Sequence, residues 1–204
     1  MLKKIVHHRV MTKDQAAGPA NLFDGYRKFR ESTYPQYKAL YDRLSTHGQR
    51  PRTMVIACAD SRVDPGTIVS AAPGELFVTR SVANIVPPYA PGRDFHSTEA
   101  GLEFAVCTLE VENLVVMGHG QCGGITALLD GLHQTKATEF VGPWIKVAAE
   151  ARERVVKRLG DAPREKLQLA LEEENIRLGL SQLMTSPWIA EKVPAGKLPL
   201  HGRH

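Results

Sequence analysis

Several features that would place a protein in a particular class are absent from this sequence of 204 residues. No apolar run approaches the ~18–20 residues that a membrane-spanning helix needs, so we expect no membrane partner. Residues 1–11 contain no apolar stretch behind Lys3 and Lys4, so we expect no secretory signal. Although the net charge is +4, basic residues alternate with acidic ones instead of clustering, which argues against nucleic-acid binding.

Cysteine is scarce, with three residues in the whole chain. Because no secretory signal is evident, we expect these thiols to be reduced and the protein to be cytoplasmic. In a reducing compartment, cysteines near a histidine are more often metal ligands or catalysts than disulfide partners. The remaining composition, 43% hydrophobic and 24% charged, is that of an ordinary globular domain and excludes wholesale disorder.

The order of apolar runs predicts an α/β fold, built as a single domain over residues 1–204. We expect a loose arm at residues 1–20 and an N-terminal helical extension at residues 21–48, where apolar side chains recur at helical spacing. Over residues 53–202, strands alternate with helices, which favours a mostly parallel central sheet flanked by helices. The expected strands are 53–58, 75–79, 113–117 and a short edge strand at 198–200, and the expected later helices are 97–109, 125–132, 140–159 and 163–184.

Two of the expected strands end in side chains that can carry chemistry. Cys58 closes the first strand, and His119 and Cys122 follow the third in the pattern His-x-x-Cys. Because ligands bind at the carboxyl ends of strands in open α/β sheets, these three side chains can converge at one edge. Two thiolates and an imidazole suit zinc, and three protein ligands leave one position open, as in catalytic zinc sites.

Asp60 and Arg62 follow Cys58 in the pattern Cys-x-Asp-x-Arg. Asp60 could bind the metal directly or accept a hydrogen bond from a water at the open position, and an ion pair with Arg62 would favour the second. Each feature also has an ordinary interpretation, such as a buried cysteine, a loop histidine or a Gly-rich phosphate-binding loop. The combination of both patterns favours the metal site. Cys107, within an apolar helical pattern, is expected in the core.

Several motifs together resemble those of the β-class carbonic anhydrases. The resemblance extends from about residue 20 to residue 202, and its motifs lie at residues 58–63, 73–78, 80–84, 86–89, 102–106 and 118–124. It implies a zinc lyase that reversibly hydrates carbon dioxide to bicarbonate and a proton. It further implies that zinc is held by Cys58, His119 and Cys122, and that Asp60 and Arg62 form a catalytic dyad.

The resemblance also implies a subtype and a substrate pocket. One subtype carries tryptophan where this sequence has Val55, whereas the plant-like subtype carries glutamine where this sequence has Gln49. We therefore expect the plant-like subtype, with an open zinc and a Gln49 that reaches the active site of the neighbouring subunit. The residues expected to form the apolar substrate slot and to donate hydrogen bonds to substrate oxygens are Gln49, Phe77, Val82, Phe104 and Gly123.

The sequence departs from the family pattern at two places. Ser81 stands where the family usually has asparagine, and the chain stops at His204 where the family continues into an aromatic-rich strand, so we expect that strand to be absent. We expect a homodimer or homotetramer whose other partner is the small-molecule substrate. The alternatives are carbonyl sulfide or carbon disulfide hydrolysis, a non-catalytic zinc-stapled interaction module, and a thiol-redox protein that uses Cys58 and Cys122.

Overall fold

The computed structural model describes residues 20–92 and 97–204, so all of the expected loose arm except Ala20 lies outside the described residues. The chain forms two units, residues 1–49 and residues 50–204, and each is described here by itself. That both units make up one domain stays a prediction. In the described ranges, no helix combines the length and the apolar composition needed to cross a membrane.

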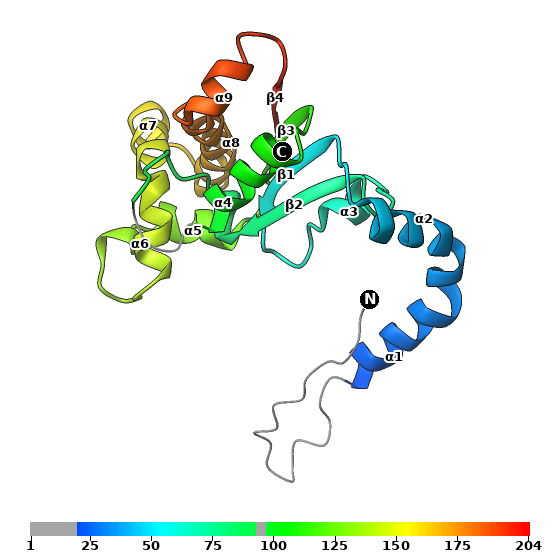
Figure 1. The fold of residues 1–204 in the computed structure, drawn as a ribbon. Coiled ribbons are helices and arrows are strands. Elements are labelled where there is room, and N and C mark those ends of the chain that lie inside the picture. Colours follow the sequence, from blue (N-terminus) through cyan, green and yellow to red (C-terminus); the bar gives the residue numbers. More distant parts are fainter. Residues whose placement is uncertain (1–19, 93–96) are drawn as a thin grey trace. The chain divides into compact units, whose positions relative to one another are not determined.

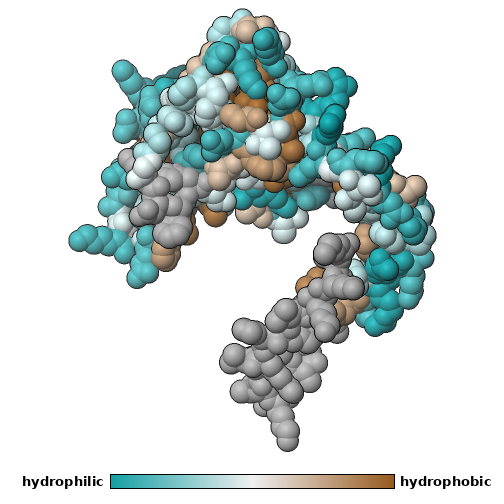
Figure 2. Space-filling model, in the orientation of Figure 1, coloured by the Kyte–Doolittle hydropathy of each residue, from teal (hydrophilic) through white to brown (hydrophobic). Residues whose placement is uncertain are grey.

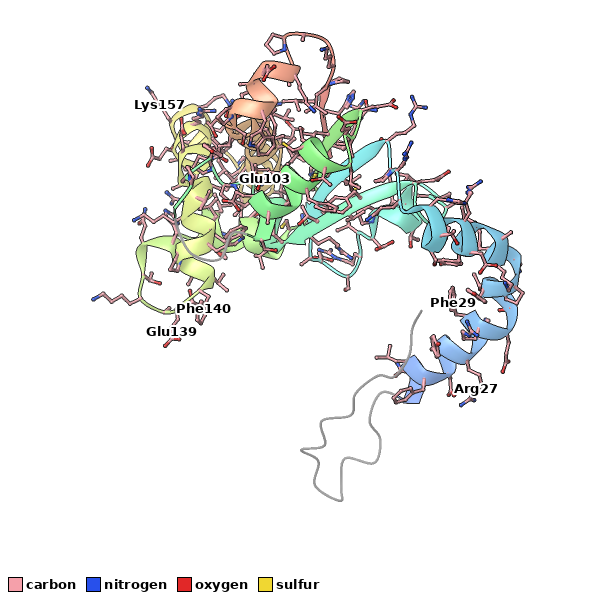
Figure 3. All side chains as sticks on the ribbon, in the orientation of Figure 1. Arg27, Phe29, Glu103, Glu139, Phe140 and Lys157 are labelled. Atoms are coloured by element: carbon pink, nitrogen blue, oxygen red, sulfur yellow. The ribbon has the colours of Figure 1, made fainter. Side chains whose placement is uncertain are left out.

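The described part of the first unit consists of consecutive helical segments. α1 (Ala20–Lys28) runs into the π-helical segment η2 (Phe29–Thr33), which leads into α2 (Tyr34–His47). Aromatic rings join these segments, because the ring centre of Tyr41 lies 6.2 Å from that of Phe29 and 5.5 Å from that of Tyr34 (Figure 3 labels Phe29). α2 ends at His47, and the Gly48 that follows has a φ of 78°, a conformation that glycine adopts without strain. The predicted N-terminal helices are confirmed.

The second unit is built on a four-stranded sheet in which all neighbouring strands are parallel, in the order β2-β1-β3-β4 (Figure 1). The central strand β1 is buried at five of its six positions, which fits its uninterrupted apolar sequence. The predicted mostly parallel sheet is confirmed, although its edge strand begins at residue 200, where the expected strand ends. The strands are β1 (Thr53–Cys58), β2 (Leu76–Ser81), β3 (Asn113–Met117) and β4 (Leu200–Arg203).

Helices flank this sheet, and most of them match the predicted ranges. The expected helix at 163–184 is α8, whereas the expected helix at 140–159 is divided into three shorter segments. Two helices of four and six residues, α3 and α9, were not predicted, because apolar periodicity needs a longer window. The segments are α3 (Pro65–Ile68), η3 (Val82–Asn84), α4 (Ser97–Glu103), η4 (Phe104–Thr108), α5 (Gly123–Leu129), η5 (Leu132–Gln134), α6 (Val141–Ile145), η6 (Lys146–Ala148), α7 (Ala149–Leu159), α8 (Arg164–Leu183) and α9 (Pro187–Lys192).

Two clusters of buried side chains form the core of the second unit. The first surrounds the sheet and includes Met54, Ile56 and Leu114, none of which is exposed. The second lies around the carboxyl ends of the strands and includes Cys58 and Cys122 together with side chains of α5 and α8. Each fully buried large aliphatic side chain stabilises the fold by ~1.5–3 kcal/mol. The two cysteines are therefore backed by well-packed apolar structure.

Two side chains of the expected helix at 97–109 face solvent instead of the core. Cys107 is exposed, so its assignment to the core is wrong. Ala105 and Val106 occupy the buried positions of this π-helical segment, and Cys107 after them faces away from the core. Helical spacing also predicts Phe104 on the apolar side of this segment, but its side chain is 44% exposed.

The surface of the second unit is mostly hydrophilic on the face that Figure 2 shows, with an apolar area near its middle. Charged side chains such as Glu103 and Lys157 lie on the outer faces of α4 and α7 (Figure 3). Phe140 is an exception, because it is 80% exposed next to Glu139 just before α6 (Figure 3).

Candidate metal centre

The structure brings together the three side chains that the sequence singled out as metal ligands. Cys58 is the last residue of β1, His119 follows β3 after one glycine, and Cys122 immediately precedes α5. Their ligand atoms all lie within 4.8 Å of one another. All three residues are buried, with exposed fractions of 5%, 8% and 1%. β1 and β3 are adjacent and parallel, so their carboxyl ends deliver these groups to one place.

The spacing of the sulfur atoms fits a tetrahedral zinc ion. Zinc–sulfur bonds of about 2.3 Å at a tetrahedral angle hold two sulfurs about 3.8 Å apart. The Sγ atoms of Cys58 and Cys122 lie 3.9 Å apart. The donor set is therefore suited to zinc in both chemistry and spacing.

The histidine has the orientation of a metal ligand. Its Nδ1 lies 3.0 Å from the carbonyl oxygen of Gly120, and a carbonyl can only accept, so Nδ1 carries the proton. Its Nε2 is buried and has no hydrogen-bond partner among the described residues. A neutral imidazole with a free Nε2 lone pair is the form that binds a metal, and the bond at Nδ1 fixes the ring orientation.

The two cysteine sulfurs titrate as a pair. A hydrogen bond from Cys122 lowers the pKa of Cys58, because the thiolate of Cys58 accepts the remaining proton. The same hydrogen bond, together with burial, raises the pKa of Cys122. One proton is therefore lost readily and the second is retained in the absence of a cation. A divalent cation displaces the second proton by compensating the charge of both thiolates.

Asp60 and Arg62 form the ion pair that the sequence predicted. The Arg62 backbone N–H and side-chain Nε each donate to Asp60 Oδ1 at 2.9 Å, and the Arg62 Nη2 donates to Oδ2 at 2.8 Å. These hydrogen bonds hold the pKa of the Asp60 carboxyl well below its usual range. Arg62 Nη2 also donates to the Gln121 carbonyl oxygen at 2.9 Å, which ties the pair to the His119–Cys122 loop.

Arg80 is a further organising residue that sequence reasoning did not assign. It lies on β2 and donates from Nε to the carbonyl oxygen of Cys58 at 2.9 Å and from Nη2 to that of Asp60 at 2.6 Å. These bonds satisfy the carbonyl groups where β1 ends and fix the backbone between ligand and carboxylate. Arg80 belongs to one of the motifs of the resemblance, but the pattern alone gave no indication of these contacts.

Gly124 allows a close approach between α5 and the turn after β2. A Cβ atom at Gly124 would lie 2.9 Å from both Val82 Cγ1 and Ala83 Cβ. Ala83 and Asn84 both have positive φ values, 61° and 46°, so this turn is strained as well as tightly packed. A Cβ at Gly123 would meet nothing within 4 Å, so the backbone there is open. Val82 and Gly123, both predicted site residues, thus come from segments in contact.

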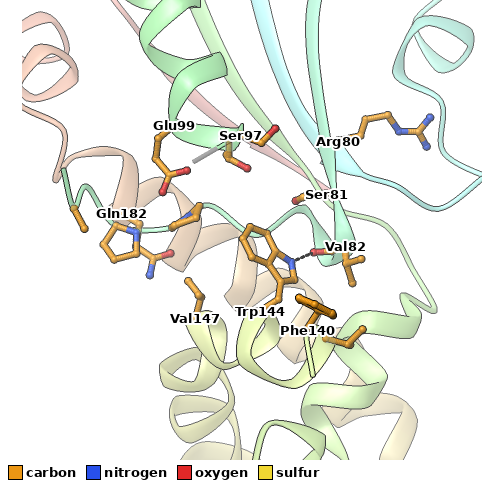
Figure 4. A pocket seen from close by; sticks show the side chains of 14 residues that line it. Arg80, Ser81, Val82, Ser97, Glu99, Phe140, Trp144, Val147 and Gln182 are labelled. Carbon is orange, nitrogen blue, oxygen red and sulfur yellow. Dashed lines mark hydrogen bonds between the residues drawn. The ribbon is translucent and has the colours of Figure 1, made fainter. Parts of the chain in front are cut away.

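Val82 also borders a cavity of about 610 Å³ in the second unit (Figure 4). Its carbonyl oxygen accepts a hydrogen bond from Trp144 Nε1 at 2.8 Å, drawn as the dashed line in Figure 4. Pro87, Pro88 and Phe140 contribute to the mostly apolar wall. The three candidate metal ligands do not line this cavity.

Phe77 and Phe104 contact each other but lie away from the metal ligands of their own chain. Their ring centres are 5.8 Å apart. In the sheet register Phe77 pairs with Met54, four positions before Cys58, or about 13 Å along the strand. Gln49, the remaining predicted site residue, is exposed and belongs to the first unit.

Comparison with known proteins identifies many similar chains. A family model described as carbonic anhydrase matches residues 53–204. Beta carbonic anhydrase 3 of Arabidopsis thaliana is 38% identical over 184 residues, covering 88% of this chain and 70% of that protein. This chain spans between 54% and 70% of the length of three curated relatives that it matches.

Solved structures agree with the sequence comparison. The structure of the β-carbonic anhydrase CcaA has a TM-score of 0.84 and 36% identity, covering 90% of this chain and 82% of that one. A structure from a study of two tetrameric β-carbonic anhydrases of Sordaria macrospora has a TM-score of 0.71 and 28% identity, covering 93% and 89%. Both the sequence and the fold therefore match the same family.

Proposed function

This chain belongs to the β class of the carbonic anhydrase family, and we propose that it catalyses the reversible hydration of carbon dioxide to bicarbonate and a proton. The observation that carries the proposal is the convergence of Cys58, His119 and Cys122 within 4.8 Å, with a free Nε2 on the histidine. Zinc is the cofactor of this family, and in such a site it would act as a Lewis acid that activates water.

We infer that Asp60 orients the reacting water. Its Oδ2 lies 4.0 Å from His119 Nε2, so a water beside the ligands is within reach of this oxygen. Because Arg62 keeps the carboxyl ionised, Asp60 accepts a hydrogen bond from the water and leaves a lone pair of the water oxygen free to attack carbon. The proton released by the reaction then leaves to solvent or buffer.

We propose that a second copy of the chain completes the substrate site. Val82 lies at the metal end of β2, whereas Phe77 lies near its opposite end and Phe104 is 44% exposed. A slot that includes all three side chains therefore needs Phe77 and Phe104 from another subunit. The Gln49 side chain would likewise reach the site of the neighbouring subunit. The side-chain amide of Gln49 and the backbone N–H of Gly123 would donate hydrogen bonds to substrate oxygens.

A homodimer or homotetramer provides this arrangement, and the related Sordaria macrospora proteins are described as tetrameric. Coexpression of a Gln49→Ala chain with an Asp60→Asn chain tests it. If Gln49 acts in the neighbouring site, each mixed pair contains one intact site, and about a quarter of all sites are restored by random pairing. If Gln49 acts within its own chain, no mixed pair contains an intact site and coexpression restores nothing.

The direct test of the reaction is stopped-flow carbon dioxide hydration on purified protein of known zinc content. We expect activity proportional to bound zinc and lost in Cys122→Ser, which removes one ligand. A protein with bound zinc and no hydration activity would instead be a zinc-stapled interaction module. A protein that forms a Cys58–Cys122 disulfide on oxidation, requires no metal and does not hydrate carbon dioxide would indicate thiol-redox chemistry.

A panel with carbonyl sulfide and carbon disulfide distinguishes substrates that the same site could take. We propose carbon dioxide as the preferred substrate and the cytoplasm as the compartment, because the site requires two free thiols. A higher kcat/KM for either sulfur compound than for carbon dioxide would overturn the substrate assignment.

A further inference from the structure

A buried carboxylate on α8 contacts the backbone of one candidate zinc ligand. Glu172 is 3% exposed, and its Oε1 accepts a hydrogen bond from the backbone N–H of Cys122 at 2.9 Å. The same oxygen accepts from Gln168 Nε2 at 2.7 Å, and Oε2 lies 3.2 Å from His204 Nε2. Both carboxylate oxygens are therefore engaged, which offsets the cost of burying the charge.

The carbonyl group of Cys122 is held from the same helix. Gln168 Nε2 donates to this oxygen at 3.3 Å, and Thr126 Oγ1 donates to it at 3.0 Å. Gln168 Oε1 lies 3.2 Å from Thr126 Oγ1 and is the alternative acceptor for the single proton of that hydroxyl. The N–H and the C=O of one residue are thus both fixed by side chains of α8, four positions apart and on the same helix face.

Fixing these two groups fixes the direction of the Cys122 side chain. Cys122 precedes α5 with φ of −69° and ψ of 117°, and rotation of either angle would move Sγ relative to Cys58 and His119. Its Sγ lies 3.9 Å from that of Cys58, which is close to the separation that zinc requires. Small rotations would therefore lengthen a metal bond rather than simply shift a loop.

We propose that Glu172 and Gln168 are positioning residues that hold Cys122 in its zinc-binding orientation and so set the zinc affinity of the site. The inference rests on the proposed zinc centre. It adds to that centre two residues that are remote in sequence from every proposed ligand. It predicts that removing the hydrogen-bond acceptor at position 172 weakens zinc binding even where the fold persists.

The test measures zinc affinity by competition with a chromophoric chelator in the full chain. We expect Glu172→Ala to weaken zinc binding by about 10–100-fold, the usual effect of losing a group that orients a ligand. Glu172→Gln keeps an oxygen that can accept from Cys122 N–H, so we expect it to recover most of this affinity. The cobalt-substituted proteins give a second readout, since the thiolate absorption band should shift in Glu172→Ala and return in Glu172→Gln.

Glu174 provides a matched control on the same helix. It is 6% exposed and pairs with Arg154 at 3.2 Å and Arg177 at 3.3 Å, without a contact to Cys122. Glu174→Ala therefore removes a buried carboxylate and destabilises the fold, but it should leave zinc affinity within about twofold of the unmodified chain. Equal weakening by Glu172→Ala and Glu174→Ala would overturn the proposal, because it would assign the effect to general destabilisation.

Unchanged zinc affinity in Glu172→Ala would overturn it as well. If that variant does not fold, Gln168→Ala decides, since it removes the donor that α8 supplies to the Cys122 carbonyl and leaves the carboxylate. Weaker zinc binding in Gln168→Ala supports the positioning role, and unchanged binding refutes it. Failure of the unmodified chain to bind zinc would be a separate result, which would remove the proposed function and this inference together.

Discussion

Replacement of Asp60 by asparagine isolates the role of one oxygen atom. The carboxylate accepts two hydrogen bonds from Arg62 at Oδ1 and one at Oδ2. Asparagine has a single acceptor oxygen, which satisfies most donors when it occupies the Oδ1 position. The amide NH₂ then takes the place of Oδ2, the atom that lies 4.0 Å from His119 Nε2. There it places one donor opposite another, Arg62 Nη2, and directs an N–H toward the candidate metal site.

The substitution therefore replaces an acceptor by a donor at the atom that we propose orients the reacting water. Loss of a positioned acid–base group costs about 10²–10⁴-fold in rate. Because the new N–H also directs the water the wrong way, we expect kcat/KM to fall by about 10³-fold or more. Zinc content should stay the same, since the ligands Cys58, His119 and Cys122 are untouched.

The assay is stopped-flow hydration with a pH indicator, with zinc measured on the same samples. Asp64→Asn is the matched control, because Asp64 lies four residues on and accepts a hydrogen bond from the Thr67 N–H at 2.8 Å at the start of α3. Asp64 is the N-cap of α3, and asparagine accepts this capping hydrogen bond as well as aspartate does, so the Asp64→Asn variant should retain its hydration activity. Asp60→Asn with full zinc and at least half of the original activity would refute the assigned role.

Three further predictions follow from the same geometry. In the zinc-loaded protein only the exposed Cys107 should react quickly with a thiol reagent. Removal of zinc by a chelator should make Cys58 and Cys122 reactive as well, and three fast-reacting thiols before chelation would contradict the ligand set. Arg62→Lys keeps the charge but loses the bidentate hydrogen bonding to the Asp60 carboxylate, so hydration activity should fall by about 10–100-fold. An unchanged rate would show that the bidentate geometry is dispensable. The pKa of Asp60 is lowered by hydrogen bonds from Arg62, so the stabilisation is complete above the unfolded carboxyl pKa of about 3.9 and is lost as pH falls below it. Urea midpoints of the metal-free unmodified and Asp60→Asn proteins should therefore approach each other as pH falls below about 4, and a constant difference would contradict the linkage.

The local pattern of side chains was sufficient to predict the main elements of the second unit. Uninterrupted apolar runs predicted β1 and β3, because a central parallel strand is buried on both faces. Helical periodicity predicted α8 to within one residue at each end. It was less successful at α9, where six residues provide too little periodicity to detect.

The sequence by itself also determined the chemistry of the metal centre. Cys58, His119 and Cys122 each stand at a strand end or in the loop that follows, and a parallel sheet gathers such positions at one edge. Tertiary structure alone decided which groups support them. Glu172 lies in a run of three glutamates on a helix, and nothing in that run indicates that one carboxylate is buried against the backbone of Cys122. Arg80 likewise became significant only through contacts across strands.

The physical reason is the range of the interactions. Strand and helix signals depend on neighbours within a few residues, whereas the contact between Glu172 and Cys122 joins groups 50 residues apart. The direction in which a side chain points follows from packing, as Phe104 and Cys107 show by facing solvent from an apolar segment. The candidate ligands could therefore be predicted from the sequence, whereas the groups that orient them depend on how the chain packs.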